Sequence, residues 1–235
     1  MHYNDVSLKK WIDKMKILAI DSTTEVCSAA LMNGDEVAHR KQKAPRQHAK
    51  LILPMIEELL IEVGYKLSDL DALALTIGPG SFTGLRIAAG VVQGLAYGAD
   101  LPVAIISTLA VLAQGAYEQF NSMNLLPALD ARMQQVYWGA YRINKHGLAE
   151  PMIDDSVSDP DKVCVPKDDN WIGVGSGWQV YSDGLKKRIG QQLQIYPDCY
   201  PEAKYILSLA KDKFERNELV TAAEVLPIYL RDMSE

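Results

Sequence analysis

The sequence predicts an α/β protein of two domains, and three observations lead to this prediction. Short apolar segments of strand length alternate along the chain with longer segments of helical periodicity. Each half opens with a strand that ends in an aspartate, Asp21 or Asp130, and a second strand follows closely. In each half a glycine-rich loop also joins a strand to a helix, at residues 78–84 and 173–177.

The composition is that of a soluble globular protein. The chain has 235 residues, of which 48% are hydrophobic and 23% charged, so it can bury a sizeable core. No run reaches the roughly 18 apolar residues of a membrane span. Residues 1–14 lack the apolar core of a secretory signal, and we set them aside as a leader because the strand pattern begins only at Met15. We therefore expect a cytoplasmic protein with no membrane contact.

The cysteines, the histidines and the net charge argue against several classes of site. Cys27, Cys164 and Cys199 are an odd number without CxxC spacing, which disfavours a disulfide framework and a zinc site. None of the four histidines has a second histidine three or four residues away, so we expect no metal site. The net charge of −6 disfavours a protein that grips nucleic acid by itself, because such proteins carry a basic face.

The first domain, residues 15–112, is expected to open with three antiparallel strands and to continue with helices between further strands. Asn33-Gly34 is a tight-turn signal between the second strand and the third. The expected strands are residues 16–20, 26–32, 36–43, 71–77 and 102–106, and the expected helices are residues 47–63 and 85–98.

The helix at 47–63 has more apolar residues than one buried face needs. Its apolar stripe includes Leu51, Met55 and Leu59, whereas Leu53 and Ile61 lie away from that stripe. A helix enclosed by its own domain remains an alternative. The surplus favours a second surface for burial, and we expect Leu51, Met55 and Leu59, with His48 near the helix start, to contact a partner.

The helix at 85–98 carries glycine at every fourth position, at Gly90, Gly94 and Gly98. Each interior glycine costs a helix about 1 kcal/mol relative to alanine. Such a stripe lets another backbone come close, and we expect tight packing to offset the cost. The stripe and Arg86 complete the expected partner interface.

The second domain, residues 113–235, is expected to repeat the strand–aspartate–turn–strand opening. Ser107 is expected to cap a helix that runs through residue 117. Residues 154–169 are expected to form a solvated loop. Two α/β halves with this opening predict mixed sheets flanked by helices, in an actin/Hsp70-like (ASKHA) fold. The further expected elements are strands at 125–130, 135–141, 171–177 and 192–196, and helices that end near 189 and span 201–216.

The glycine loop at 78–84 invites a phosphate-binding reading, because backbone N–H groups at a helix N-terminus favour anions. Its spacing matches neither a dinucleotide fingerprint, nor a Walker loop, nor a hydrolase elbow. A tight structural turn and an anion or nucleotide phosphate site at Gly80 and Ser81 both stay open, and we expect no catalytic residue.

Asp21, Ser22 and Thr23 could bind phosphate and Mg²⁺ as the first phosphate hairpin of an actin-like ATPase does. They could equally cap a hairpin turn, because Asp and hydroxyl side chains bond their own backbone there. The loop at 173–177 could pass under an adenine, although glycine loops between strand and helix are common.

Several long motifs resemble the TsaB (YeaZ) family of tRNA threonylcarbamoyladenosine biosynthesis proteins, over residue 15 to the end. The most specific is the run Gly-Pro-Gly-Ser-Phe-Thr-Gly-Leu-Arg at 78–86. The other matching segments are residues 15–24, 93–96, 129–132, 136–138 and 227–231.

The resemblance implies a paralogous partner, TsaD. That partner transfers threonylcarbamoyl to N6 of the adenosine beside the anticodon, in tRNAs that read codons beginning with A. It also implies an ATPase, TsaE. TsaD carries an HxxxH metal pair, and the positions aligned with it are Thr108 and Leu112.

We therefore expect a non-catalytic scaffold that forms a heterodimer with TsaD, closes on itself as a homodimer when isolated, and reaches tRNA only through the complex. We expect no cofactor of its own, although ATP or ADP could sit at a subunit junction. Two enzyme classes remain as alternatives. One is a metallopeptidase-like "glycoprotease", and the other is an actin-like ATP-binding protein.

Overall fold

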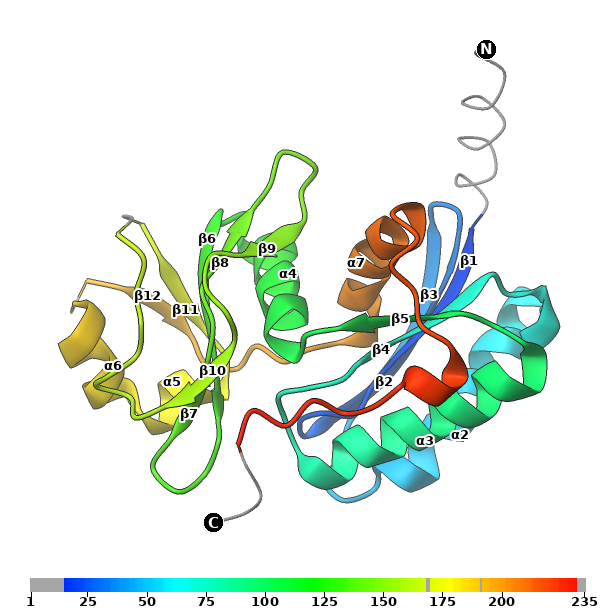
Figure 1. The fold of residues 1–235 in the computed structure, drawn as a ribbon, viewed down its shortest axis with the longest axis horizontal. Coiled ribbons are helices and arrows are strands. Elements are labelled where there is room, and N and C mark those ends of the chain that lie inside the picture. The colour runs from blue at the N-terminus through cyan, green and yellow to red at the C-terminus, as the bar shows by residue number, and fades with distance from the viewer. Residues whose placement is uncertain (1–14, 168–169, 191, 232–235) are drawn as a thin grey trace. The chain divides into compact units, whose positions relative to one another are not determined.

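The chain folds into two compact units of mixed α/β structure, each described here by itself (Figure 1). Among the described residues no helix is long and apolar enough to cross a membrane. The computed structural model describes residues 15–167, 170–190 and 192–231, so the expected leader 1–14 lies outside the described residues.

The two units are not consecutive stretches of sequence. After residue 201 the chain returns to the first unit. The predicted division, with its single boundary after residue 112, does not include this return. The first unit comprises the described residues to 77, then 83–106 and 202–227, and the second comprises 78–82, 107–201 and the described residues from 228.

The sheet of the first unit has the strand order β3-β2-β1-β4-β5. β1, β2 and β3 form the expected antiparallel meander, with Gly34 at a positive φ of 61° in the turn. β4 and β5 add to β1 in parallel. The strands are β1 (Lys16–Asp21), β2 (Val26–Asn33), β3 (Glu36–Lys43), β4 (Ala72–Thr76) and β5 (Val103–Ile106).

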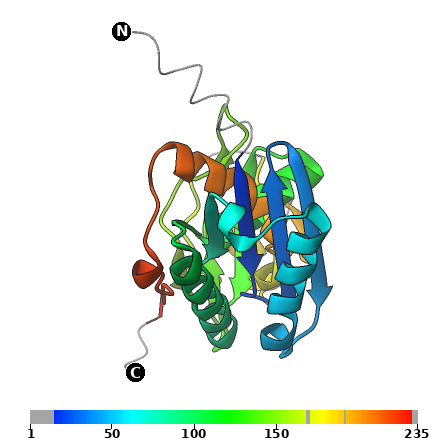
Figure 2. The ribbon, with the colours of Figure 1, turned by 90° about the vertical axis from the view of Figure 1, so that its right-hand side faces the viewer.

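Helices cover both faces of this sheet. α2 (His48–Val63) and α3 (Phe82–Ala99) lie side by side on one face, where their apolar side chains share one core with the strands (Figure 2). α7 (Ala203–Glu215) lies on the other face, against β1, β2, β4 and β5. Short 3-10 turns at Leu67–Asp69 and Ala222–Glu224 complete the unit.

A row of four alanines crosses the sheet beneath α7. Ala30 pairs with Ala19, Ala19 pairs with Ala74, and Ala74 pairs with Ala104, so each stands beside the next on one face. All four are buried. Methyl side chains leave room for a helix to approach a sheet closely. This explains why α7 packs on the first sheet, although the expected division placed residues 201–216 in the second domain.

The sheet of the second unit is centred on β6, which pairs with β7 and β8 antiparallel and with β11 parallel. The expected single strand at 135–141 is two strands in the structure. β7 and β8 keep one register on β6, but Pro127 stands opposite Gly139 between them and has no N–H to donate to the ladder. The strands are β6 (Asn124–Asp130), β7 (Val136–Trp138), β8 (Tyr141–Ile143), β9 (Ala149–Pro151), β10 (Ser156–Ser158), β11 (Ile172–Val174) and β12 (Gln194–Tyr196).

The expected solvated loop at 154–169 contains β10, which pairs with the edge of β7. Asp155, beside it, accepts a hydrogen bond from the Tyr141 hydroxyl at 2.8 Å and another from Ser107. The loop prediction is wrong for this part, because the free edge of β7 offers backbone partners. Residues 168–169 lie outside the described residues.

The helices of the second unit are α4 (Thr108–Phe120), α5 (Ser176–Val180) and α6 (Ser182–Ile189). Ser107 caps α4 as expected, accepting hydrogen bonds from the N–H groups of Leu109 and Ala110. The core gathers around Trp138 and Trp178, whose rings lie 5.8 Å apart.

Replacing Gly173 with alanine should destabilise the protein. The added Cβ would lie 2.4 Å from the indole of Trp178, a clash that forces the ring or the strand to move. We expect a loss of roughly 2 kcal/mol in the free energy of unfolding, the usual scale for overpacking. Urea unfolding followed by circular dichroism measures it. Gly94→Ala is the matched control, because nothing lies within 4 Å of a Cβ there; an equal loss in both variants would contradict the packing argument.

Candidate functional site

The aspartate at the end of β1 is held inside the first unit by its own neighbours. Asp21 is fully buried. Its carboxylate accepts hydrogen bonds from the Thr23 hydroxyl at 2.9 Å, from the Thr23 backbone N–H at 3.3 Å, and from the Thr76 hydroxyl at the end of β4. These hydrogen bonds are those of a capped hairpin turn, one of the two alternatives for these residues.

Burial is the main influence on this carboxyl group. It raises the pKa of Asp21 to about 6, against the opposing effect of the hydrogen bonds from Thr76 and Thr23. Burial also raises the pKa of the neighbouring Cys27 thiol to about 12, with the Asp21 charge adding to the rise. A carboxyl group that titrates near neutral pH inside a fold makes stability depend on pH.

The residues predicted to contact a phosphate are divided between the two units. Ser22 lies with Asp21 in the first unit, where its hydroxyl donates to the carbonyl of Gly84 in α3 at 2.8 Å. Gly80 and Ser81 belong to the second unit. A phosphate site that uses both sets stays a prediction.

The glycine loop at 173–177 is filled by the chain itself. The indole of Trp178 occupies the space beside Gly173. A Cβ at Gly175 or Gly177 would lie within 3 Å of atoms of Ala128. Close packing of the α5 segment against β6 thus explains these glycines without an adenine.

The glycine stripe of α3 differs from the loop at 173–177, because the described residues do not fill the space beside it. Gly90, Gly94 and Gly98 are exposed, and apart from the nearby backbone of their own helix no atom of the described residues lies within 4 Å of a Cβ built on any of them. Arg86 is exposed on the same helix. Nothing within the described chain uses the close approach that these glycines permit.

On α2, the apolar residues expected to contact a partner are Leu51, Met55 and Leu59. Met55 and Leu59 face the sheet and are buried in the core, and Leu51 is partly buried. Their place in the 3.6-residue stripe explains this, because the stripe faces the unit's own core. The exposed apolar side chains are Leu53 and Ile61, which are 51% and 73% exposed.

Tyr97 on α3 was not among the expected interface residues, although it is 86% exposed. Its position three residues after Gly94 was the available signal, since residues three apart share a helix face. We call the exposed residues Leu53, Ile61, Arg86, Gly90, Gly94, Tyr97 and Gly98 of these two helices the α2–α3 face.

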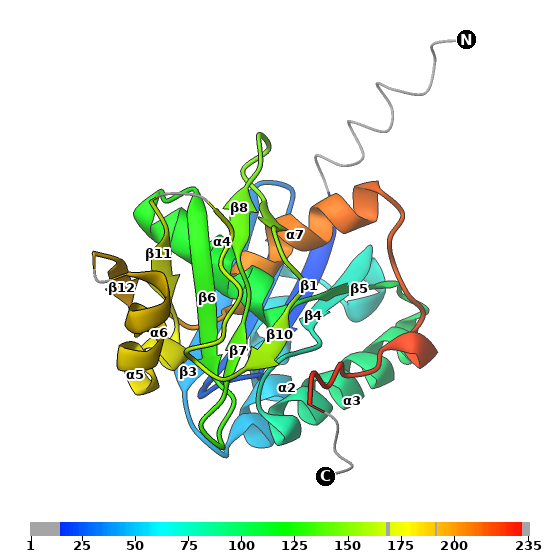
Figure 3. The ribbon, with the colours of Figure 1, turned by 60° about the vertical axis from the view of Figure 1, so that its left-hand side comes forward.

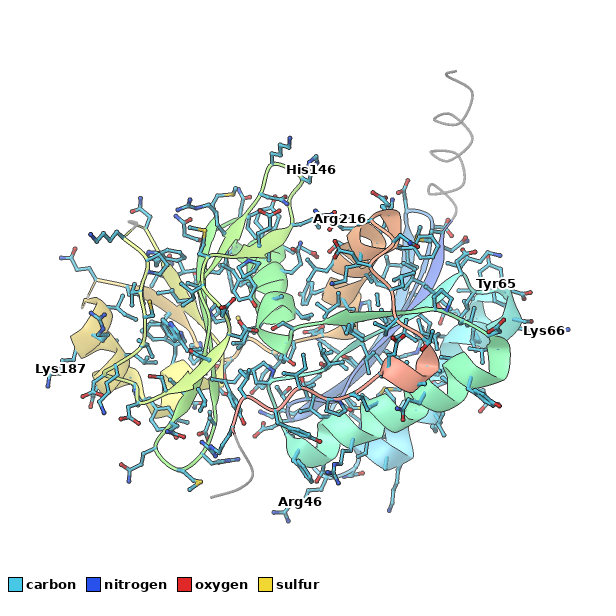
Figure 4. All side chains as sticks on the ribbon, in the orientation of Figure 1. Arg46, Tyr65, Lys66, His146, Lys187 and Arg216 are labelled. Atoms are coloured by element: carbon cyan, nitrogen blue, oxygen red, sulfur yellow. The ribbon has the colours of Figure 1, made fainter. Side chains whose placement is uncertain are left out.

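His48 at the start of α2 is buried, which does not suit an exposed contact residue. Within the described chain its Nε2 atom has no hydrogen-bond partner. The adjacent Arg46 is exposed, and Figure 4 shows its side chain pointing away from the body of the unit.

Thr108 and Leu112, the two positions that the resemblance places opposite a histidine pair, lie on α4. Thr108 and Leu112 are both buried in the second unit. In the part of the chain that the structure describes, no three His, Cys, Asp or Glu side chains are grouped to hold a metal ion.

Comparison with known protein families and proteins gives one consistent result. Residues 36–234 match the family model described as TsaD: tRNA N6-adenosine threonylcarbamoyltransferase. The tRNA threonylcarbamoyladenosine biosynthesis protein TsaB of Escherichia coli is 40% identical, over 93% of this chain and 95% of that protein. The TsaB of Bacillus subtilis is 34% identical, over 92% of this chain and 94% of that protein.

The solved structure of YeaZ from Pseudomonas aeruginosa is also similar. It matches with a TM-score of 0.86 and 41% identity, covering 92% of this chain and 100% of that one. The predicted fold class, two α/β units with mixed sheets flanked by helices, is confirmed.

Replacing Asp21 with asparagine should remove a pH dependence of stability. The folded carboxyl holds its proton up to about pH 6, whereas an unfolded aspartate loses it near 3.8. Between these values the folded state binds more protons, so its stability falls as pH rises. The whole fall is on the order of 3 kcal/mol. The Asp21→Asn variant should lack this fall in stability. At pH 8 it should therefore be more stable than the wild type.

Urea unfolding at a series of pH values checks this prediction. Asp35→Asn, at an exposed aspartate in the β2–β3 turn, is the control and should follow the wild type. If Asp21→Asn keeps the full pH dependence, another group is the one that titrates.

Proposed function

This chain belongs to the TsaB family of tRNA threonylcarbamoyladenosine biosynthesis proteins, and we propose that it acts there as a non-catalytic scaffold. Its partner would be a TsaD-type transferase, which it binds and activates together with the ATPase TsaE. The observation that carries this proposal is the open glycine stripe on α3.

Three interior glycines reduce the helix stability of α3 by about 1 kcal/mol each relative to alanine. In the second unit, comparable glycines are explained by Trp178 and Ala128 packing against them. Around Gly90, Gly94 and Gly98 there is no such neighbour. A helix from another chain that packs along the stripe would use the space and account for the cost.

The rest of the α2–α3 face suits a protein partner. Leu53, Ile61 and Tyr97 are large apolar side chains at more than half exposure, which a partner would remove from water. Arg86 stands near the start of the glycine stripe, and arginine and tyrosine are enriched where interfaces carry most of their binding energy. A paralogous partner has helices of the same kind, so the same face could close on a second copy as a homodimer when the partner is absent.

The buried side chains support a scaffold in preference to an enzyme. Asp21 is committed to hydrogen bonds from Thr23 in its own hairpin and from Thr76 at the end of β4. Thr108 and Leu112 leave the aligned metal positions without a histidine. The chain would thus supply shape to the complex, and the transferase would supply the chemistry. A nucleotide at the junction of the two chains, and tRNA held through the complex, belong to the same proposal.

Gly94→Leu should weaken binding to the transferase. The isobutyl side chain would stand where the partner backbone comes close, and we expect at least a tenfold loss of affinity, or about 1.4 kcal/mol. The fold should survive, because the site is open and leucine is a better helix former than glycine. Calorimetric titration of the variant with the transferase measures the affinity.

Lys187→Leu is the matched control, since it places the same side chain on an exposed position of α6 in the second unit (Figure 4). It should bind like the wild type. A folded Gly94→Leu variant with unchanged affinity would show that the partner does not use this stripe.

Leaving this chain out of a reconstituted reaction should abolish or strongly reduce threonylcarbamoyl transfer to unmodified tRNA. The mixture contains the transferase, the ATPase, the activated threonylcarbamoyl donor and the tRNA. The chain alone should give no transfer. Full activity without it would contradict the scaffold role, and turnover by the chain alone would contradict the non-catalytic one.

A further inference from the structure

Two hydrogen bonds hold α3 in addition to its apolar packing. Ser22, which follows Asp21 at the end of β1, is fully buried and donates its hydroxyl to the carbonyl of Gly84 in the first turn of the helix, at 2.8 Å. Midway along the helix, the Gln93 amide donates to the carbonyl of Val225 at 2.9 Å. The C-terminal segment that carries Val225 runs beside α3 (Figure 3). We call these two bonds the α3 tethers, and both lie within the first unit.

Each tether ends on a part of the unit that is itself fixed. The carboxylate of Asp21, next to Ser22, accepts hydrogen bonds from two threonine hydroxyls, one in the hairpin and one at the end of β4. Val225 is fully buried in the core. Its segment is joined to the edge of β5 by two backbone hydrogen bonds between Val220 and Val103, both of 2.9 Å. The tethers therefore connect α3 to the sheet at two separate places.

α3 has less apolar anchorage than its neighbour α2. Three of its buried side chains are alanines, and its outer face carries the glycine stripe. Stabilisation by burial grows with the apolar area removed from water, and interior glycines reduce the stability of the helix itself. The buried side chains are Leu85, Ala88, Ala89, Val92 and Ala96 on α3, and His48, Ile52, Met55, Ile56 and Leu59 on α2. The tethers thus supply a larger share of what keeps α3 in place.

We propose that Ser22 and Gln93 are positioning residues for partner binding, because they fix α3 in the free chain where the partner needs it. The inference rests on the proposed function, in which a helix of the transferase packs along the glycine stripe. A gap of roughly 1 Å already removes up to half of the attraction between packed atoms, so such packing depends on the exact place of the α3 backbone. A helix that is fixed beforehand also loses less freedom on binding, which raises the affinity.

The tethers also give a role to motifs that the scaffold proposal leaves unused. The Ser22 tether joins two of the segments that resemble the family, residues 15–24 and 78–86. The Gln93 tether joins the segment 93–96 to the chain just before the segment 227–231. Both side chains bond main-chain carbonyls, as a structural joint does. A purely structural role, without bearing on the partner, is therefore the competing explanation that the experiment must separate.

Hydrogen exchange of the free chain, followed by mass spectrometry, tests whether the tethers order α3. Ser22→Ala removes one tether and leaves the sequence of the helix unchanged. Amides in the first half of α3 should exchange about fivefold faster, the effect expected from one lost hydrogen bond on local opening. Gln93→Ala should do the same in the middle of the helix. Gln93 is only partly buried, so this second variant should fold even if Ser22→Ala does not.

Calorimetric titration with the transferase tests whether this order matters for binding. Each tether variant should bind about fivefold more weakly than the wild type, and the entropy of binding should be less favourable, because the partner must then order α3. Ser22 is fully buried, so the effect of Ser22→Ala does not come from a lost contact with the partner.

Ser28→Ala is the matched control. Ser28 is buried in the same sheet and accepts the backbone N–H of Ala203 at 2.9 Å, so it fixes the start of α7 on the other face. Its loss should reduce overall stability but leave the exchange of α3 and the affinity unchanged. An equal loss of affinity in Ser28→Ala would overturn the proposal, because it would show a general effect of stability. Wild-type exchange and affinity in both tether variants would overturn it as well.

The two measurements separate this inference from the scaffold role. If the wild-type chain does not bind the transferase, the proposed function fails. The exchange of the free chain then decides whether the tethers order α3, since faster exchange confined to α3 supports it and unchanged exchange overturns it. If the wild-type chain binds, faster exchange with unchanged affinity would overturn the positioning role and leave the tethers a structural one.

Discussion

Close contact between α7 and the first sheet is the constraint on which the first unit depends. Four alanines in register, Ala30, Ala19, Ala74 and Ala104, give the sheet a smooth face, and α7 lies over it. Ser28 in the adjacent row accepts the backbone N–H of Ala203, which fixes the first residue of the helix. Because of this contact, the chain must come back to the first unit after building most of the second. A larger side chain in the row would push the helix away and expose the far face of the sheet.

Glycines serve two different purposes in the two units. In the second unit, Gly173, Gly175 and Gly177 let β11 and α5 approach Trp178 and Ala128, and the space is filled. In the first unit, the stripe on α3 leaves space that nothing in the described chain fills. The same residue type therefore serves internal packing in one place and, under the proposed function, contact with a partner in the other. Only the atoms around each position separate the two cases, and they support a scaffold over a nucleotide-binding enzyme.

The end of each opening strand shows a similar contrast. Asp21 turns inward and is bonded by Thr23 and Thr76, so its hairpin is a closed structural element. Asp130 is bonded by Tyr181 and Arg132, and its turn presents an exposed guanidinium. The repeated strand–aspartate–turn pattern of the sequence thus leads to a buried carboxyl group in one half and to a charged surface turn in the other. The difference lies in burial, which desolvates the first aspartate.

The sequence by itself determined the family, the fold class and the order of most strands and helices. These follow from local patterns such as the Asn33-Gly34 turn, the Ser107 cap and the run at 78–86. Only the tertiary structure decided which residues of α2 stay exposed, because a helical stripe does not say whether it faces its own sheet or a partner. That is why Met55 and Leu59 are core residues, and Leu53 and Ile61 lie outside. The split of residues 135–141, the strand at Ser156–Ser158 and the return of α7 depend on contacts between segments far apart in the chain, which no local pattern encodes.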